Sequence, residues 1–303
     1  MEKRLFITNF KIKHINSIKT FIKNIDSTAS DRNDISKSKF MLSNLNEYHN
    51  QVSNSPISIK IVTNGIEDYT VNNKRYKIES NSYLIVNSSD DFEVNIKTND
   101  MTSGICIYPP EKLITEVFNY RLKSEEKLLE TEGFSHNEIK FTQKTNSLRA
   151  TSTGLFLKEY LPDILKNGND TLINFNSLYI KIAEHLVQDQ LMIDNRLLNF
   201  KSSKKQTKEE LYRRVSEAKD YIHDNYNKKI RIEELATIAC LSKYHFLRSF
   251  RDFYKCTPYQ YILKLKLEAA KHLLTKGFSF SQITEIIGFS DPKNLRRSIN
   301  KFF

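Results

Sequence analysis

Two stretches in the last third of the chain place basic and polar side chains at helical spacing. In the first, Tyr244, Leu247 and Arg248 stand at positions i, i+3 and i+4, which puts them on one face of a helix. The basic residues of the second stretch are Lys293, Arg296 and Arg297. A helix fits the major groove of DNA, where such side chains bind phosphates and base edges. The spacing therefore favours contact with double-stranded DNA, and a solvated basic helix is the alternative for either stretch alone.

The pattern around these residues occurs twice. Each copy predicts a short helix, a tight turn and a second helix, and the copies begin at about Ile230 and Phe278. Ser242 is suited to accept a backbone N–H at the start of one second helix, and Gly288 allows the tight turn before the other. Two such units in tandem weaken the solvated-helix alternative. The candidate DNA-binding residues are Ser242, Tyr244, His245, Leu247, Arg248, Lys293, Arg296 and Arg297.

Apolar residues and helix boundaries predict how these units are held. Phe246, Phe250 and Phe253 recur at i, i+4 and i+7, so we expect them to point into a core. Thr257-Pro258 and Gly277 bound a connecting helix of about 19 residues, roughly 28 Å long at 1.5 Å per residue. Successive major grooves on one face of DNA are about 34 Å apart, so this spacer would hold two second helices over adjacent grooves.

Nearly all of the net positive charge lies in the same part of the chain. The chain of 303 residues has 47 basic and 36 acidic residues and a net charge of +11, whereas residues 204–303 hold 21 basic and 11 acidic residues, a net charge of +10. A nearly neutral body joined to a basic segment suits a polyanionic partner. A merely lysine-rich surface is the alternative when charge is taken alone.

The N-terminal part predicts β structure followed by helices. Residues 57–108 contain five or six short β-rich runs with turn signals between them, which is typical of a small β barrel or sandwich. Helical periodicity begins at residue 111, with long helices predicted at about 141–165 and 171–198. The last helix has an apolar stripe, for which burial in a core is favoured and an exposed homodimer seam is the alternative. The stripe comprises Leu178, Ile182, Leu186, Leu191 and Met192.

The predicted organisation is an α+β fold of two domains. Residues 1–198 form the first, with a β-rich part at 57–108 and a helical part at 111–198. Residues 199–208 are polar, basic and without periodicity, so they are assigned as the linker. Residues 209–303 form the second, all-helical domain.

The cysteines and histidines argue against an enzyme. Cys106, Cys240 and Cys256 are too scattered for a zinc–thiolate site, and we interpret them as small apolar fillers, with a redox switch as the alternative. All seven histidines lie outside residues 57–108, where a metal-dependent cupin oxygenase would need its ligands. Nucleophile-elbow and P-loop patterns are absent. We therefore expect no catalytic residues, no metal and no cofactor.

The sequence also predicts where the protein works. No apolar run approaches the roughly 18 residues that span a bilayer. The first residues, from Met1 to Phe6, lack the apolar region of a signal peptide. We expect a cytoplasmic protein without membrane contact.

The last third resembles the AraC/XylS family of transcription regulators over about residues 209–303. The matching motifs are Glu233-Glu-Leu-Ala, Leu241-Ser-x-x-x-Phe-x-Arg-x-Phe, Thr257-Pro-x-x-Tyr, Leu267-x-x-Ala-x-x-Leu-Leu and Ile286-x-Gly-Phe-Ser-Asp-Pro. The resemblance implies that Tyr244, Leu247 and Arg248 face bases from the first unit. It gives Pro292, Lys293, Arg296 and Arg297 the equivalent place in the second unit.

The chain departs from the family at three points. Lys255 stands where the family usually has glycine, although a left-handed turn suits glycine better. Leu247 cannot hydrogen-bond a base but can touch a thymine methyl group. The family usually continues beyond Phe303 through a further turn and a closing helix, so we expect the second helix-turn-helix unit to be looser or to bind mainly through phosphate.

The resemblance also implies an N-terminal effector domain, a cupin-like barrel followed by dimerising helices. Residues 57–108 and 111–198 fit that order. A small-molecule effector would then occupy an apolar pocket lined by Tyr69, Tyr76, Tyr83 and Phe92, for which ordinary core packing is the favoured alternative. The family further implies a bacterial activator, with RNA polymerase and a second copy of the chain as partners. The predicted function is sequence-specific, effector- or partner-controlled transcription regulation, and a non-specific architectural DNA-binding protein is the alternative.

Overall fold

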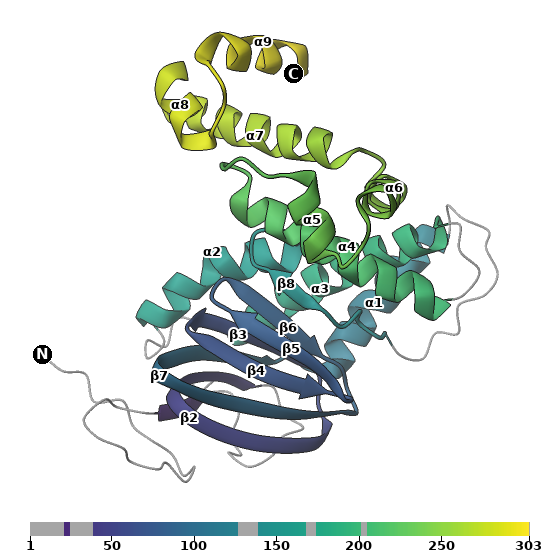
Figure 1. Ribbon diagram of the computed structural model, residues 1–303. Helices are drawn as coiled ribbons and strands as arrows, with labels where there is room; N and C mark the ends of the chain where they lie inside the picture. The colour runs from purple at the N-terminus through teal and green to yellow at the C-terminus, as the bar shows by residue number, and fades with distance from the viewer. Residues whose placement is uncertain (1–20, 25–38, 127–138, 168–173, 201–204, 303) are drawn as a thin grey trace, which may run out of the picture. The chain divides into compact units, whose positions relative to one another are not determined.

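The computed structural model describes residues 21–24, 39–126, 139–167, 174–200 and 205–302 (Figure 1). The start of the helix predicted from residue 171, the first six residues and Phe303 lie outside the described residues. The chain divides into two compact units, residues 1–192 and 193–303, which we describe separately. Helix α4 begins at Lys205, within the segment predicted as the linker.

The first unit is built on a nearly closed antiparallel β barrel of eight described strands (Figure 1). Strand β7 is 19 residues long and pairs with β2, β3 and β4, so it joins the two sides of the barrel. A small barrel predicted from residues 57–108 is confirmed, and β2 and β8 extend it beyond that range. The strands are β1 (Phe21–Asn24), β2 (Lys39–Ser55), β3 (Ser58–Asn64), β4 (Ile66–Val71), β5 (Lys74–Glu79), β6 (Ser82–Val86), β7 (Asp90–Tyr108) and β8 (Thr145–Ser147).

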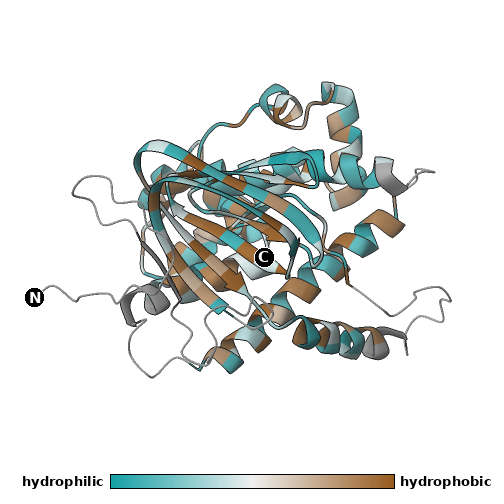
Figure 2. Cartoon of the chain, turned by 90° about the horizontal axis from the view of Figure 1, so that it is seen from below, coloured by the Kyte–Doolittle hydropathy of each residue, from teal (hydrophilic) through white to brown (hydrophobic). Residues whose placement is uncertain are grey.

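The two faces of the sheet contribute to different cores. Ile59 and Ile107, a cross-strand pair on β3 and β7, pack into a core shared with the helices that follow the barrel. Val62 and Leu84 belong to a second core whose members all come from strands, so this core fills the barrel interior. Apolar and polar residues therefore neighbour one another along the barrel strands (Figure 2).

Three described helices follow the barrel in the first unit: α1 (Glu111–Glu126), α2 (Ser152–Asn167) and α3 (Phe175–Leu198), whose end belongs to the second unit. The predicted helix at 141–165 is wrong in its first half, because β8 there pairs with β6 and α2 begins only at Ser152. In the stripe on α3, Leu178, Ile182 and Leu186 are buried in the core and Leu191 packs against it, whereas Met192 is exposed. The core interpretation of this stripe is therefore confirmed.

The described residues of the second unit form the end of α3 and six further helices. They are α4 (Lys205–Asn225), α5 (Ile232–Ile238), α6 (Lys243–Tyr254), α7 (Pro258–Thr275), α8 (Phe280–Ile287) and α9 (Pro292–Phe302). One core is formed mainly by α4, α5 and α6, and it buries Phe246, Phe250 and Phe253 as predicted. A smaller core joins α7, α8 and α9 around Leu295. No described helix is long and apolar enough to cross a membrane.

Candidate nucleic-acid interface

The first helix-turn-helix unit consists of α5, a four-residue turn and α6. The hydroxyl oxygen of Ser242 accepts a hydrogen bond from the backbone N–H of His245 at 3.3 Å, which caps α6. Ser242 therefore has a structural role at the start of the candidate reading helix. Cys240 occupies the turn with a φ of +50° and is exposed, so the apolar-filler interpretation is wrong for this cysteine.

The outward face of α6 presents polar and basic side chains. Tyr244 is 76% exposed, and His245 and Arg248 are also exposed, whereas Leu247 is half-buried. Among the described residues, the guanidinium of Arg248 has no hydrogen bond or ion pair. Lys243, by contrast, forms an ion pair with Glu233 of α5 at 2.5 Å. Arg248 is therefore the basic side chain of the predicted set on α6 that is available to an incoming ligand.

The second helix-turn-helix unit repeats this arrangement with α8 and α9. A side-chain oxygen of Asp291 accepts a hydrogen bond from the backbone N–H of Asn294 at 2.8 Å at the start of α9. Lys293 and Arg297 are exposed and, within the described ranges, make no ion pair. Arg296 is also exposed and lies over the ring of Phe280, 5.6 Å from its centroid. The three predicted basic residues of α9 thus share its outward side, with Arg296 held by an aromatic contact.

Helix α7 joins the two helix-turn-helix units, and the turn between α8 and α9 contacts both α7 and the loop before α5. Thr257 and Gln260 form a capping box at the start of α7, and the helix is 18 residues long, about 27 Å at 1.5 Å per residue. Lys266 donates a hydrogen bond to the backbone oxygen of Gly288 at 2.5 Å. A Cβ atom at Gly288 would lie 1.9 Å from the backbone oxygen of Asn227, in the loop between α4 and α5. Gly288 therefore permits both a left-handed turn and close approach of the two helix-turn-helix units.

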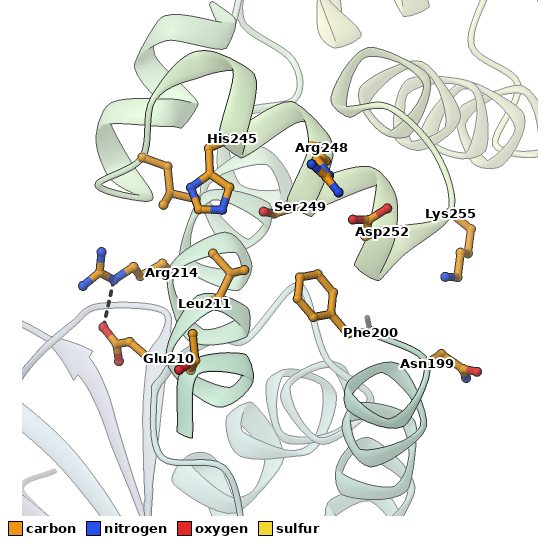
Figure 3. Close-up of a pocket in the computed structure, with 12 residues that line it drawn as sticks. Asn199, Phe200, Glu210, Leu211, Arg214, His245, Arg248, Ser249, Asp252 and Lys255 are labelled. Carbon is orange, nitrogen blue, oxygen red and sulfur yellow. Dashed lines mark hydrogen bonds and ion pairs between the residues drawn. The ribbon is translucent and has the colours of Figure 1, made fainter. Parts of the chain in front are cut away.

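A hollow of about 870 Å³ lies beside α6. His245, Arg248 and Asp252 line it from α6, Leu211 lines it from α4, and Phe200 lines it from the segment after α3 (Figure 3). All of its lining residues belong to the compact unit of residues 193–303. Arg248 thus borders both the outward face of α6 and this hollow.

An ion-pair network on α4 forms part of the wall of this hollow. Glu210 accepts hydrogen bonds from Arg213 at 2.8 Å and from Arg214 at 2.8 Å, and the latter pair is drawn in Figure 3. The hydrogen bonds from Arg213, opposed by partial burial and supported by Arg214, lower the pKa of Glu210 to about 2. The carboxylate therefore stays charged at neutral pH, and the two guanidiniums are held on one side of α4.

The chain's similarity to known proteins is strongest in this second unit. A family model described as a helix-turn-helix domain matches residues 235–303. The probable transcription factor PqrA of Proteus vulgaris is 38% identical over 78 residues, 25% of this chain and 64% of PqrA. The Msm operon regulatory protein of Streptococcus mutans is 24% identical over 179 residues, 56% of this chain and 62% of that protein. Residues 235–303 form an AraC-type helix-turn-helix domain.

The AraC-type domain contains every candidate DNA-binding residue, all of which lie on α6, on α9 or at the cap of α6. The chain spans less than two thirds of the length of both curated relatives, which are named as transcription factor and operon regulator rather than as enzymes. Among solved structures, ToxT from Vibrio cholerae is 13% identical, with a TM-score of 0.34 over 87% of this chain and 93% of ToxT.

The AraC-type domain also presents a basic residue that the sequence analysis did not select. Arg251 is exposed on α6, one turn beyond Arg248. It lies seven residues after Tyr244 and three after Arg248, so extending the helical spacing by one turn would have found it.

The predicted ligand-lining residues of the first unit do not surround one cavity. Tyr69, Tyr76 and Phe92 are buried in the core of the barrel interior. Tyr83 belongs to the other core, on the opposite face of the sheet, and its hydroxyl lies 2.7 Å from the Thr151 hydroxyl. Tyr83 is therefore separated from the other three by the sheet, because neighbouring residues on a strand alternate between faces.

Proposed function

We propose that this protein is a sequence-specific DNA-binding transcription regulator. The observation that carries the proposal is the exposed, unpaired guanidinium of Arg248 on the second helix of a helix-turn-helix unit. A second unit with the same build follows at α8 and α9. The domain's similarity to transcription regulators supports the same function.

In the proposed complex, α6 enters the major groove and Arg248 donates two parallel hydrogen bonds to a guanine edge. Tyr244 and His245, beside it, contact bases or the sugar–phosphate backbone. Leu247 is half-buried and offers only its outer carbons, which suits contact with a thymine methyl group. Ser242 positions these side chains by capping α6, and its place at a helix N-terminus suits a phosphate contact.

The second helix-turn-helix unit is proposed to bind DNA mainly through its positive charge. Lys293, Arg296 and Arg297 on α9 neutralise phosphates, and they set the register of the first unit on the duplex. Helix α7 is about 27 Å long, somewhat shorter than the roughly 34 Å between successive major grooves on one face. The spacing suits two contacts on one side of the DNA, about one helical turn apart.

The first unit is proposed to control how the AraC-type domain is presented to DNA. A small molecule or partner protein bound there is the effector, and RNA polymerase and a second copy of the chain are proposed as further partners in the cytoplasm. Three of the residues predicted to line the effector's site, Tyr69, Tyr76 and Phe92, are packed together in the core of the barrel interior. Binding energy for such an effector would come largely from apolar burial.

The experiment that tests the function is selection of duplexes from a randomised library by the full chain. We expect one motif to be enriched, with two conserved elements about one helical turn apart. Selection with an Arg248→Ala chain should lose the preference at one position of the first element. Enrichment of no motif would overturn the proposal.

Non-specific architectural binding is the second candidate function. It is favoured by the net charge of +10 on residues 204–303, because charge alone binds phosphates of any sequence. In the same selection, this function predicts recovery of duplexes without a common sequence. Strong binding that falls steeply with salt, without an enriched motif, would establish it in place of regulation by sequence.

A further inference from the structure

The barrel interior contains a buried lysine that forms no close ion pair among the described residues. Lys60 is 3% exposed and lies on β3, where its neighbours Ile59 and Ile61 point to the other face of the sheet. Within the part of the chain that the structure describes, no carboxylate lies within ion-pair distance of its Nζ atom. The buried Glu67 carboxyl interacts with Lys60 electrostatically from beyond ion-pair distance. A buried ammonium is costly unless it is compensated, so the groups in direct contact with its Nζ atom decide how it is held.

Lys60 and Cys106 face each other across the ladder between β3 and β7. They are direct register partners, so their side chains share the interior face of the sheet. The Nζ atom of Lys60 lies 2.8 Å from the Sγ atom of Cys106. This pair is therefore in contact through both the backbone ladder and the side chains.

Two aromatic side chains also contact the ammonium. Lys60 donates a hydrogen bond to the hydroxyl oxygen of Tyr108 at 2.9 Å, and its Nζ atom lies 4.5 Å from the centroid of the Phe92 ring. Burial, with the nearby Cys106, raises the pKa of Tyr108 to about 12, so its phenol stays neutral at physiological pH. Both rings therefore stabilise the cation beside the sulfur.

Cys106 is more exposed than Lys60. Cys106 is half-buried, whereas Lys60 is 3% exposed. Reactive cysteines occupy such electropositive, partly exposed places, and small peroxides convert their thiols to sulfenic acids. A sulfenic acid formed at Cys106 would be in direct contact with an amine nitrogen.

We propose that Cys106 is a peroxide-reactive thiol whose oxidised form is captured by Lys60. In the first step, sulfur attacks one peroxide oxygen, the O–O bond breaks, and the released hydroxide leaves as water with the thiol proton. In the second, the Lys60 ammonium first loses one proton to solvent, and the freed nitrogen lone pair bonds to sulfur as the S–O bond breaks. A second proton from the nitrogen leaves with the hydroxyl as water. The product is a sulfur–nitrogen link between β3 and β7.

This modification is independent of the proposed function, and its test is a mass measurement on the full chain. The reduced protein is treated with hydrogen peroxide, its remaining thiols are alkylated under denaturing conditions, and it is digested with a protease. We expect a linked pair of peptides containing residues 60 and 106, lighter by two hydrogen atoms than the separate peptides together. A thiol reductant should restore the separate peptides.

Variants and an internal control make the result specific. Lys60→Met should give Cys106 with added oxygen and no link, and Cys106→Ser should give neither product. Cys240 is an exposed thiol in the same chain and should gain oxygen without a link. Cys106 that stays reduced while Cys240 is oxidised would overturn the proposal. So would oxygen addition at Cys106 of the unaltered chain without a linked peptide, a result that does not depend on how any variant folds.

Discussion

Arg248 ends in a guanidinium that is free of ion pairs within the described residues and lies on the outward side of α6. Arg248→Ala is expected to weaken binding to the preferred duplex by about 1–3 kcal/mol, because a bidentate contact to a base would be lost. Titration of full-length protein against the preferred and a scrambled duplex at one salt concentration measures the effect. Binding to the scrambled duplex should change much less.

An exposed arginine outside the helix-turn-helix units controls for the loss of a positive charge. Arg75 is exposed on β5, and Arg75→Ala should leave both affinities unchanged. Equal losses on the two duplexes in the Arg248→Ala protein would show that Arg248 binds phosphate and does not read bases.

The individual site residues were predictable to different degrees. The residues of α6 and α9 follow from helical spacing and local caps, so the sequence places Tyr244 and Arg248 on one face. The pair of Lys60 and Cys106 was not predictable, because 46 residues separate the two and only strand register brings them together. Tyr83 shows the same limit, since the face of a sheet on which a residue lies depends on how the strands pair.

At the scale of single elements, α4 carries an ion-pair network whose contribution to the stability of the fold depends on pH. The pKa of Glu210 is lowered from an ordinary value of 4.5 to about 2, first through its hydrogen bonds with Arg213. A carboxyl whose pKa is lowered on folding stabilises the fold fully above about pH 4.5, and that stabilisation is lost as the pH falls through about 2. Glu210→Gln should therefore lower the thermal midpoint at pH 7 and have little effect near pH 2.

The size of this effect is limited by solvent. The Glu210 side chain is more than a third exposed, so we expect less than about 1 kcal/mol at pH 7. Melting curves of both proteins, followed by circular dichroism over this pH range, measure it. A difference in midpoint that stays constant from pH 7 to pH 2 would contradict a role for the charged carboxylate.

A substitution in the turn between α8 and α9 should affect both stability and DNA binding. Gly288→Ala combines a φ of +62° with a Cβ atom 1.9 Å from the Asn227 backbone oxygen. We expect a loss of about 1–3 kcal/mol in the free energy of unfolding, together with weaker DNA binding, because the approach of the two helix-turn-helix units is disturbed. Denaturant unfolding and duplex titration measure the two quantities.

Gly277 provides the matched control for this turn. Its φ is +85°, but an added Cβ atom would meet nothing within 4 Å. Gly277→Ala should therefore carry only the backbone strain and leave DNA binding nearly unchanged. If both alanine variants behave alike, contact between the Gly288 turn and the α4–α5 loop has no role.

The helices of the second unit were more predictable than the strands of the first. Caps such as Thr257 and Ser279 act within one helical turn, and they mark the starts of α7 and α8 in the sequence. Strand β2 was missed because its residues are largely polar and its long pairing with β7 is non-local. Strand β8 was missed because only pairing with β6 keeps its three residues extended.

At the scale of the whole molecule, the boundary between the units makes a prediction about fragments. Ile193, Leu197 and Phe200 pack against the core of α4, α5 and α6, and the Phe200 ring stacks on that of Phe253 at 4.3 Å. A fragment of residues 193–303 should therefore be more stable than one of residues 205–303, because the shorter fragment loses these apolar contacts. Both fragments should keep the DNA sequence preference of the full chain.

Melting temperatures of the two fragments measure the difference in stability. Phe200→Ala in the longer fragment should move its melting temperature toward that of the shorter one, because the stacked ring would be lost. Equal melting temperatures for the two fragments would show that the segment before α4 does not support the AraC-type domain.

The central claim is that this chain distinguishes DNA sequences, and the ratio of two dissociation constants tests it most directly. Full-length protein is titrated against its selected duplex and against a scrambled duplex of equal composition, at one physiological salt concentration. We predict roughly 10³-fold tighter binding or more to the selected duplex. Equal dissociation constants, with the same salt dependence, would contradict sequence-specific regulation and leave binding by charge alone.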